Sequence, residues 1–313
     1  MNRAAIISAR TDCQVIFGGE AAALNCDGGP PVLQVALPVL AGRPDESLLA
    51  DAEMREIRAG FALFQRGTLL AGLATAPAGA SLEDAAGELY ARLFAVTAGR
   101  HLYRIWNYVP QINAVESGLE NYRRFCRGRS LAFERHFGTG FKELLPAASA
   151  VGTTAGPLAL GFLAGTALPR HFENPRQVPA FEYPPLYGPR PPSFARATAV
   201  TDEAGRHIII SGTAAIRGHE TVATGELDAQ LTCTLANLEL IAATAGAGPG
   251  LGVHAGWTRR FKIYIRHATD LAAIRRRLES ELLVAADGTH YLQADICRAG
   301  LLVEIEAILT APA

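Results

Sequence analysis

The chain has 313 residues, of which 49% are hydrophobic and 19% charged, and its formal net charge is -1. This composition excludes a disordered chain and gives no sign of the basic surface that a nucleic-acid-binding protein needs. The length is enough for two domains of ordinary size or for one large domain with a substantial buried core.

The cysteines and the lengths of the apolar runs indicate the cellular compartment of the protein. Residues 1–18 lack a basic start followed by a long apolar run, and no later stretch reaches about 18 uninterrupted apolar residues. We therefore expect no export signal and no membrane contact. No C-x-x-C pair is present, so we expect free thiols in a reducing cytoplasm rather than a zinc or redox site. The five cysteines are Cys13, Cys26, Cys126, Cys233 and Cys297.

In the first half of the chain, the hydrophobic pattern predicts strand, helix, strand, helix and closing strands. Residues 68–72 form an apolar run ended by glycine. A helix is expected to begin after Ser81, with Asp84 three residues on as a near capping box, and to stop at Gly99. A strand over 103–108, a second helix over 116–131 and the final strands over 149–164 should follow.

The second half shows the same order more clearly. Residues 207–212 are a β-branched run halted by glycine, as in a buried strand entering a turn. Leucines at three- and four-residue spacing predict a helix from about residue 226 to the stop at Gly246. A strand over 261–265, a helix over 270–283 and a closing strand over 301–309 complete the half.

The matching order favours an ancient duplication, although two unrelated α+β halves can align this loosely. We predict an α+β fold of two similar units, residues 1–196 and 197–313. Residues 170–196 are crowded with prolines and aromatic side chains. A disordered linker seldom carries so many aromatics, so this segment is expected to be an ordered cover over a site.

The carboxy-terminal third resembles the RidA (YjgF) family. The resemblance rests on LVEIEAI at residues 302–308, on Ser211-Gly212 and on the helix that ends at Ala245-Gly246. It implies two RidA-like repeats of mixed sheets packed against helices. RidA proteins hydrolyse reactive imines with an arginine on the strand before the V-E-I-E-A stretch. Residues 289–297 contain no arginine, so we do not expect imine deamination here.

Four further stretches resemble the chorismatases, and with the carboxy-terminal third they cover the chain from about residue 33 to its end. The resemblance implies an enzyme that removes pyruvate from chorismate without a metal or an organic cofactor. The stretches are HLYRIWNYVPQIN (101–113), NYRRFCRGR (121–129), FENPRQVPA (172–180) and YGPRPPSFAR (187–196).

Cleavage of a vinyl ether needs an acid that delivers a proton to the terminal methylene carbon. A glutamate between apolar neighbours on a closing strand could lie in a desolvated pocket, which raises its pKa. Glu304 and Glu306 share one face of that strand, so spacing alone cannot choose between them. The resemblance selects Glu304 as the catalytic carboxyl.

The two carboxylates of chorismate call for at least two cationic ligands. The resemblance indicates Arg129, Arg190 and Arg196, whereas Arg123 and Arg127 are interpreted as surface or helix-pairing residues. Tyr122 and Tyr187 either hydrogen-bond the substrate or pack as half-buried tyrosines. Trp106 and Phe125 are assigned to the core.

Gly212 and Cys297 match the chorismatases that form 3-hydroxybenzoate, with Cys297 helping the ring to aromatise. We therefore expect 3-hydroxybenzoate, with some 4-hydroxybenzoate, as product. The alternatives are a chorismate hydrolase that leaves a dihydroxycyclohexadiene carboxylate, and a non-catalytic RidA-like protein that binds aromatic acids. RidA proteins are trimers, but a duplication places one such interface inside a single chain, so the oligomeric state stays open between monomer and trimer.

Overall fold

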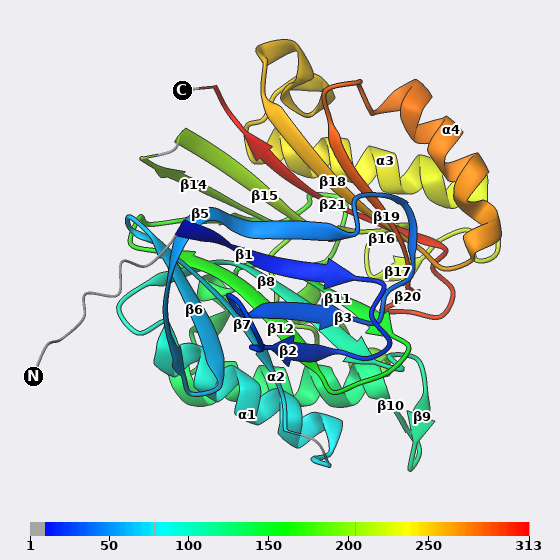
Figure 1. Cartoon of the computed structure of the whole chain (residues 1–313). Helices are drawn as coiled ribbons and strands as arrows, with labels where there is room; N and C mark the ends of the chain where they lie inside the picture. The colour runs from blue at the N-terminus through cyan, green and yellow to red at the C-terminus, as the bar shows by residue number, and fades with distance from the viewer. Residues whose placement is uncertain (1–9, 78, 204, 313) are drawn as a thin grey trace, which may run out of the picture.

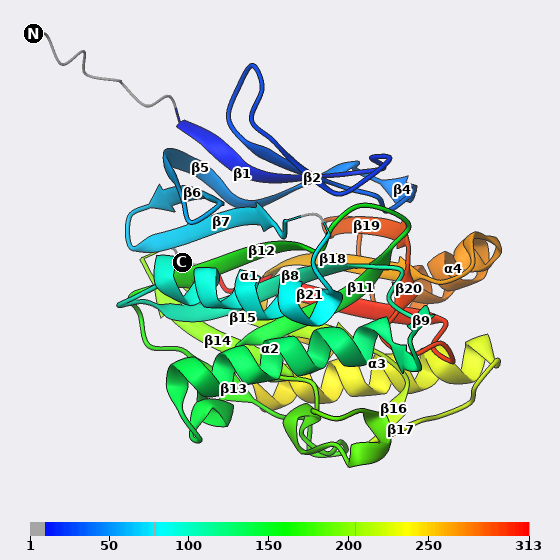
Figure 2. The same ribbon diagram turned by 90° about the horizontal axis from the view of Figure 1, so that it is seen from below.

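The computed structural model describes residues 10–77, 79–203 and 205–312. The first nine residues, on which part of the expectation about export rests, lie outside this range. The chain forms two facing sheets, with one pair of helices on each outer side (Figures 1 and 2). One core lies between the sheets, and one lies beneath each helix pair.

The first sheet is built mainly from the amino-terminal half and is covered outside by α1 (Leu82–Val96) and α2 (Asn121–Phe137). Within the described residues it runs in the spatial order β2 (Ala23–Asn25), β3 (Val32–Val35), β1 (Arg10–Phe17), β5 (Asp45–Arg58), β6 (Phe61–Arg66), β7 (Leu69–Thr75), β12 (Ala159–Gly165), β8 (His101–Pro110), β11 (Ala147–Thr153) and β20 (Asp295–Ile296).

The second sheet is built mainly from the carboxy-terminal half and is covered by α3 (Leu227–Thr244) and α4 (Leu271–Glu281). Its order is β13 (Arg170–Phe172), β14 (Ala197–Asp202), β15 (Gly205–Thr213), β21 (Val303–Thr310), β18 (Thr258–Ile265), β19 (Gly288–Gln293) and β4 (Val39–Gly42). Two small ribbons stand apart: β9 (Val115–Glu116) with β10 (Leu119–Glu120), and β16 (Ile216–Arg217) with β17 (Glu220–Thr221).

The repeat is visible in the strand order. The strands β6-β7-β12-β8-β11 and β14-β15-β21-β18-β19 follow the same path, antiparallel at the first three pairings and parallel at the last. The predicted α+β class and the repeated order are therefore confirmed. However, β4 from the first half pairs with β19, and β20 from the second half pairs with β11. A division of the chain at residue 196 stays a prediction.

The helix ends follow local chemistry. The Ser81 hydroxyl accepts a hydrogen bond from the Asp84 backbone N–H, which caps α1 as the near capping box predicts. Gly246 has a φ of 87° and lies just beyond α3. The second helix starts at Asn121, five residues later than predicted, because 115–120 form the β9–β10 ribbon around Gly118 (φ 80°).

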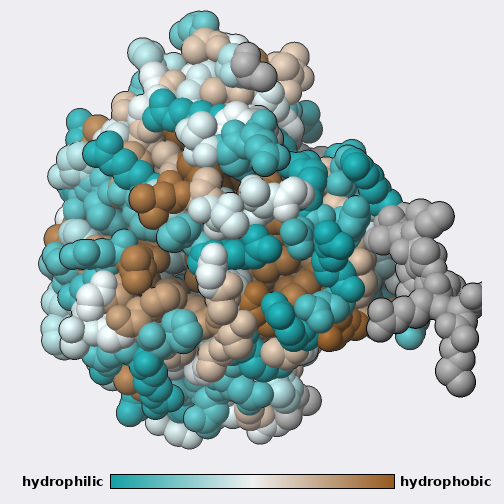
Figure 3. All heavy atoms as spheres, turned by 90° about the vertical axis from the view of Figure 1, so that its left-hand side faces the viewer, coloured by the Kyte–Doolittle hydropathy of each residue, from teal (hydrophilic) through white to brown (hydrophobic). Residues whose placement is uncertain are grey.

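All five cysteines are free thiols. Among the described residues no helix is long and apolar enough to cross a membrane. On the face shown in Figure 3, hydrophobic side chains form patches between hydrophilic ones. Nothing in this pattern selects an oligomeric state, so the choice between monomer and trimer stays a prediction.

Candidate active site

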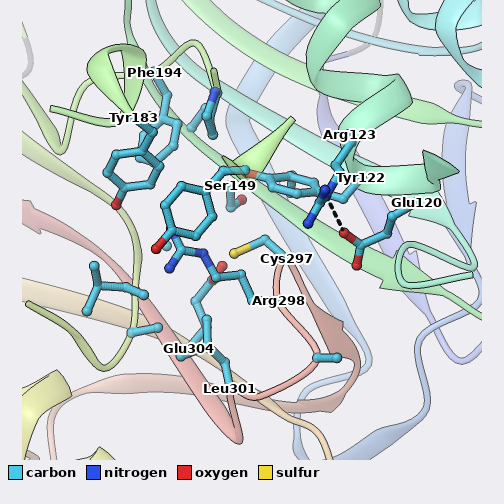
Figure 4. A pocket seen from close by; sticks show the side chains of 18 of the residues that line it. Glu120, Tyr122, Arg123, Ser149, Tyr183, Phe194, Cys297, Arg298, Leu301 and Glu304 are labelled. Atoms are coloured by element: carbon cyan, nitrogen blue, oxygen red, sulfur yellow. Dashed lines mark ion pairs between the residues drawn. The ribbon is translucent and has the colours of Figure 1, made fainter. Parts of the chain in front are cut away.

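A cavity of about 320 Å³ lies where the two halves meet. Its walls come from β11 in the first sheet, from β15 and β21 in the second, and from the start of α2 (Figure 4). Residues 183–196 close it and contribute Tyr183, Tyr187, Pro192, Phe194 and Arg196. This volume is at the small end of the range for small-molecule sites, about 300 to 1,000 Å³.

Glu304 on β21 lines this cavity, although only 4% of the residue is exposed. Its Oε1 atom has no hydrogen-bond partner among the described residues. Burial, helped by the nearby charge of Glu306, raises the pKa of Glu304 to about 8, against the opposing effect of Arg104 and Arg196. The carboxyl is therefore largely protonated at neutral pH and free to donate its proton.

Gly212 makes room for this carboxyl. The pairing of β15 with β21 shifts register between Ile210 and Thr213, which places Gly212 against Glu304. A Cβ atom on Gly212 would lie 2.0 Å from Glu304 Oε1 and 2.6 Å from its Cδ. A side chain here would make the carboxyl shift, so Gly212 matters through close approach rather than through its backbone angles.

Glu306 lies in a different environment. Its carboxylate accepts hydrogen bonds from Arg104 Nη2 (2.5 Å) and Trp106 Nε1 (2.9 Å) and pairs with Lys262 Nζ at 3.0 Å. Burial would raise the pKa of Glu306, but the two cations outweigh burial and hold the pKa at about 2. Because Glu306 is ionised and fully engaged, the contacts favour Glu304 as the acid.

Two buried arginines in the cavity have free donors. Arg129 on α2 is 1% exposed, and its Nε and Nη2 atoms lack a hydrogen-bond partner among the described residues. Arg196 donates from Nη2 to the Tyr183 hydroxyl at 2.7 Å, and its Nε stands 3.9 Å from the Glu173 carboxylate without a hydrogen bond. A buried cation with unused donors is costly unless an anion completes it, so both guanidiniums are suited to hold a carboxylate.

Arg190 does not reach the cavity. Its Nη2 donates to Glu134 on α2 at 2.7 Å, and its side chain is 34% exposed. The prediction that Arg190 lies beside Arg129 and Arg196 as a substrate ligand is therefore not supported by its position. Tyr187, Pro192, Phe194 and Arg196 from the same stretch do line the cavity, whereas the partly exposed Arg190 ties this stretch to α2.

Two arginines that were not predicted as ligands line the cavity. Arg298 stacks its guanidinium 4.1 Å from the Tyr187 ring centroid and donates from Nη1 to the His219 carbonyl at 2.8 Å. Arg123 pairs with Glu120 at 3.4 Å, which is the helix pairing expected for it, yet it also faces the cavity (Figure 4). No sequence signal separated these two from the other arginines.

The remaining predicted residues do line the cavity. Tyr122 is half-buried and stacks on Phe125, and desolvation of its phenol raises its pKa well above the usual value. The Tyr187 hydroxyl is 3.1 Å from His219 Nδ1. Burial and the nearby Glu304 charge raise the pKa of Cys297 to about 12, so its thiol stays protonated. Whether either tyrosine bonds the substrate stays a prediction.

Known proteins are similar to this chain in both sequence and fold. A family model described as "Chorismatase FkbO/Hyg5-like, N-terminal" matches residues 46–164. A chorismatase of Streptomyces rapamycinicus is 37% identical over 257 residues, which span 77% of this chain and 74% of that protein. The chain belongs to the chorismatase family. A crystal structure of a chorismatase superposes with a TM-score of 0.82 at 29% identity, covering 99% of this chain and 96% of that one.

A second relative is a 3-hydroxybenzoate synthase of Streptomyces hygroscopicus, 40% identical over 220 residues. That match spans 66% of this chain and 63% of the synthase. The family assignment therefore rests on similarity over most of the chain and on a fold shared over nearly all of it.

Proposed function

We propose that this chain is a chorismatase that removes pyruvate from chorismate and releases 3-hydroxybenzoate, with some 4-hydroxybenzoate. The observation that carries the proposal is the protonated Glu304, whose Oε1 has no partner among the described residues, in a cavity with two buried arginines that each keep unused donors. The names of the relatives, chorismatase and 3-hydroxybenzoate synthase, support the same reaction.

Substrate binding follows from charge and shape. Chorismate is a dicarboxylate, and the cavity offers Arg129 on α2 and, from other segments, Arg196 and Arg298. A charge-assisted hydrogen bond to a guanidinium contributes roughly 1.5 to 3 kcal/mol. Ligands on separate elements can hold the two carboxylates apart and fix the ether between them, which aligns it with the acid.

Glu304 begins the reaction as a general acid. Its proton forms a C–H bond at the terminal methylene carbon of the enolpyruvyl group, and the ether carbon becomes an oxocarbenium-like centre. The carboxylate left on Glu304 is a negative charge close to that positive centre and stabilises it. A raised pKa is useful here because only the protonated form can start the reaction at neutral pH.

The fate of the activated ether decides the product. In the proposed route, the neighbouring ring hydroxyl oxygen attacks the ring carbon that bears the ether, and the C–O bond breaks. Pyruvate leaves with its carbonyl restored, and the hydroxyl proton is released. The arene-oxide-like ring then opens, with its oxygen taking up one proton and the ring losing one as it becomes aromatic. The hydroxyl proton released earlier balances the proton that Glu304 gave, so no water is consumed. Attack by water on the ether carbon would instead give the dihydrodiol.

Cys297 and Gly212 support the hydroxybenzoate route. Both line the cavity with Glu304, and the protonated Cys297 thiol is a small neutral group with a weak donor. We propose that it assists aromatisation as a proton donor rather than as a nucleophile. The expectations of a cofactor-free reaction and of a cytoplasmic location, which the free cysteines support, also remain part of this proposal.

The test is incubation of the purified chain with chorismate, with pyruvate measured by a coupled assay and the aromatic products by chromatography. Pyruvate and 3-hydroxybenzoate in equal amounts are expected without added metal or nucleotide, apart from any 4-hydroxybenzoate formed. Binding of 3-hydroxybenzoate with no release of pyruvate would instead favour a non-catalytic binding protein.

A further inference from the structure

The carboxylate of Glu306 is held by matching residues from the two repeats. In strand β8, Arg104 and Trp106 point to it, and in strand β18, Lys262 and Tyr264 do the same. The two strands occupy the same place in the repeated order, and in each of them the cation stands two residues before the aromatic donor. The cage around Glu306 therefore combines a cation and an aromatic donor from each half of the chain.

This cage fixes the charge of Glu306. Two cations and two neutral donors surround a carboxylate that is 5% exposed. Protonation of the Glu306 carboxylate would leave the buried Arg104 and Lys262 without the negative charge that they pair with, which costs free energy. Lys262 also pairs with Glu46 of β5, so the cluster has its own balance of charge. Glu306 thus remains ionised while it lies outside the walls of the cavity.

Glu304, unlike Glu306, must stay protonated to act as an acid. The cavity needs cations to hold a dicarboxylate, yet every cation near Glu304 favours its ionised form, which cannot donate a proton. The cations that face this region are Arg104 from β8, Arg129 from α2, Arg196 from the cover and Arg298 before β21. The uncharged titratable groups are Tyr122, Tyr183, Tyr187, Tyr264 and Cys297, and the Glu120 carboxylate is paired with Arg123 on the far wall.

Glu306 is the carboxylate whose negative charge opposes the effect of these cations on the protonation of Glu304. It is two residues from Glu304 on the same strand, so both side chains leave β21 on one face, with their backbone positions about 7 Å apart. We propose that the ionised Glu306 carboxylate serves as a fixed negative charge that favours the uncharged, proton-donating form of Glu304. Glu306 is then a positioning residue, and its role in turnover rests on the proposed function.

The test compares the titration of the Glu304 carboxyl in wild type and in Glu306→Gln. The infrared band of the protonated carboxyl, assigned by its loss in Glu304→Gln, follows this titration without any substrate. Two charges about 7 Å apart in a protein interior predict a downward shift of roughly one to two pH units when Glu306 is neutralised. With the wild-type midpoint near pH 8, pyruvate release at pH 8 should fall roughly five- to fiftyfold and recover at lower pH.

Two further variants separate this effect from damage to the fold. Glu306→Gln/Lys262→Met removes one carboxylate and one ammonium, so the cluster keeps its net charge, and it should still shift the titration downward. Asp287→Asn breaks the buried Arg259–Asp287 pair, 2.5 Å apart and outside the cavity, and should lower stability without moving the titration.

A titration midpoint that stays at the wild-type pH in the folded Glu306 variants would overturn the proposal, as would an equal shift in Asp287→Asn. A loss of activity that is uniform across pH, with an unmoved infrared band, would show that Glu306 only supports the fold. If wild type releases no pyruvate from chorismate, the proposed function fails, while the infrared titration still decides the role of Glu306.

Discussion

Replacing Gly212 by alanine tests the geometry of the acid directly. The added Cβ would lie 2.0 Å from Glu304 Oε1, and separations below 3.0 Å are not tolerated, so the carboxyl must move by about 1 Å. A displacement of this size costs about a hundredfold in rate, or about 2.7 kcal/mol of transition-state stabilisation. The fold should survive, because the atom that must move is the end of a flexible side chain.

Pyruvate release from chorismate by Gly212→Ala, measured by a coupled assay, should therefore fall about a hundredfold in kcat/KM. The thermal unfolding midpoint should stay close to that of wild type. Gly87→Ala is the matched control, because its added Cβ would approach nothing nearer than the Gly128 carbonyl oxygen at 3.8 Å. A Gly212→Ala variant with wild-type turnover would refute the close approach of glycine and acid.

Four other outcomes are expected. Glu304→Gln should fold and bind 3-hydroxybenzoate but lose turnover at every pH, since the amide cannot deliver the proton; activity within a few-fold of wild type would remove Glu304 as the acid. In wild type, kcat/KM should fall as the pH rises through about 8, because only the protonated Glu304 donates; a profile that stays flat well above that pH would contradict this. By calorimetry with 3-hydroxybenzoate, Arg129→Ala should weaken binding by roughly 1.5 to 3 kcal/mol, whereas Arg190→Ala should have little effect; equal losses would return Arg190 to the site. Cys297→Ala should divert part of the product to the dihydrodiol, and an unchanged chromatogram would make Cys297 a packing residue.

The fold could be read from the sequence because its signals are local. The leucine spacing before Gly246 and the Ser81 cap depend on neighbours within a few residues, and both helices are present. The strands expected over 68–72 and 207–212 are also present, but β7 continues to Thr75 and β15 to Thr213, so neither strand stops at its glycine. The exchange of β4 and β20 between the sheets could not be predicted in this way. Pairing of such short strands depends on contacts between distant segments, which leave no periodic pattern.

The site was predictable only in part for the same reason. Resemblance located Glu304, Gly212 and Cys297 together, and the structure brings all three to one cavity. It could not tell that Arg190 turns outward to Glu134, or that Arg298 turns inward, since both lie in irregular segments where a side chain's direction follows no period. The distinction between Glu304 and Glu306, which share a strand face, depends on the cations that surround Glu306 from both halves.

Chromatography of the wild-type reaction with chorismate, with pyruvate quantified in the same samples, tests the proposed reaction most directly. Pyruvate is expected in an amount equal to the hydroxybenzoates, with 3-hydroxybenzoate as the main aromatic product. Absence of pyruvate would contradict the assignment of the reaction. Pyruvate accompanied mainly by the dihydroxycyclohexadiene carboxylate would contradict the hydroxybenzoate route and leave a chorismate hydrolase.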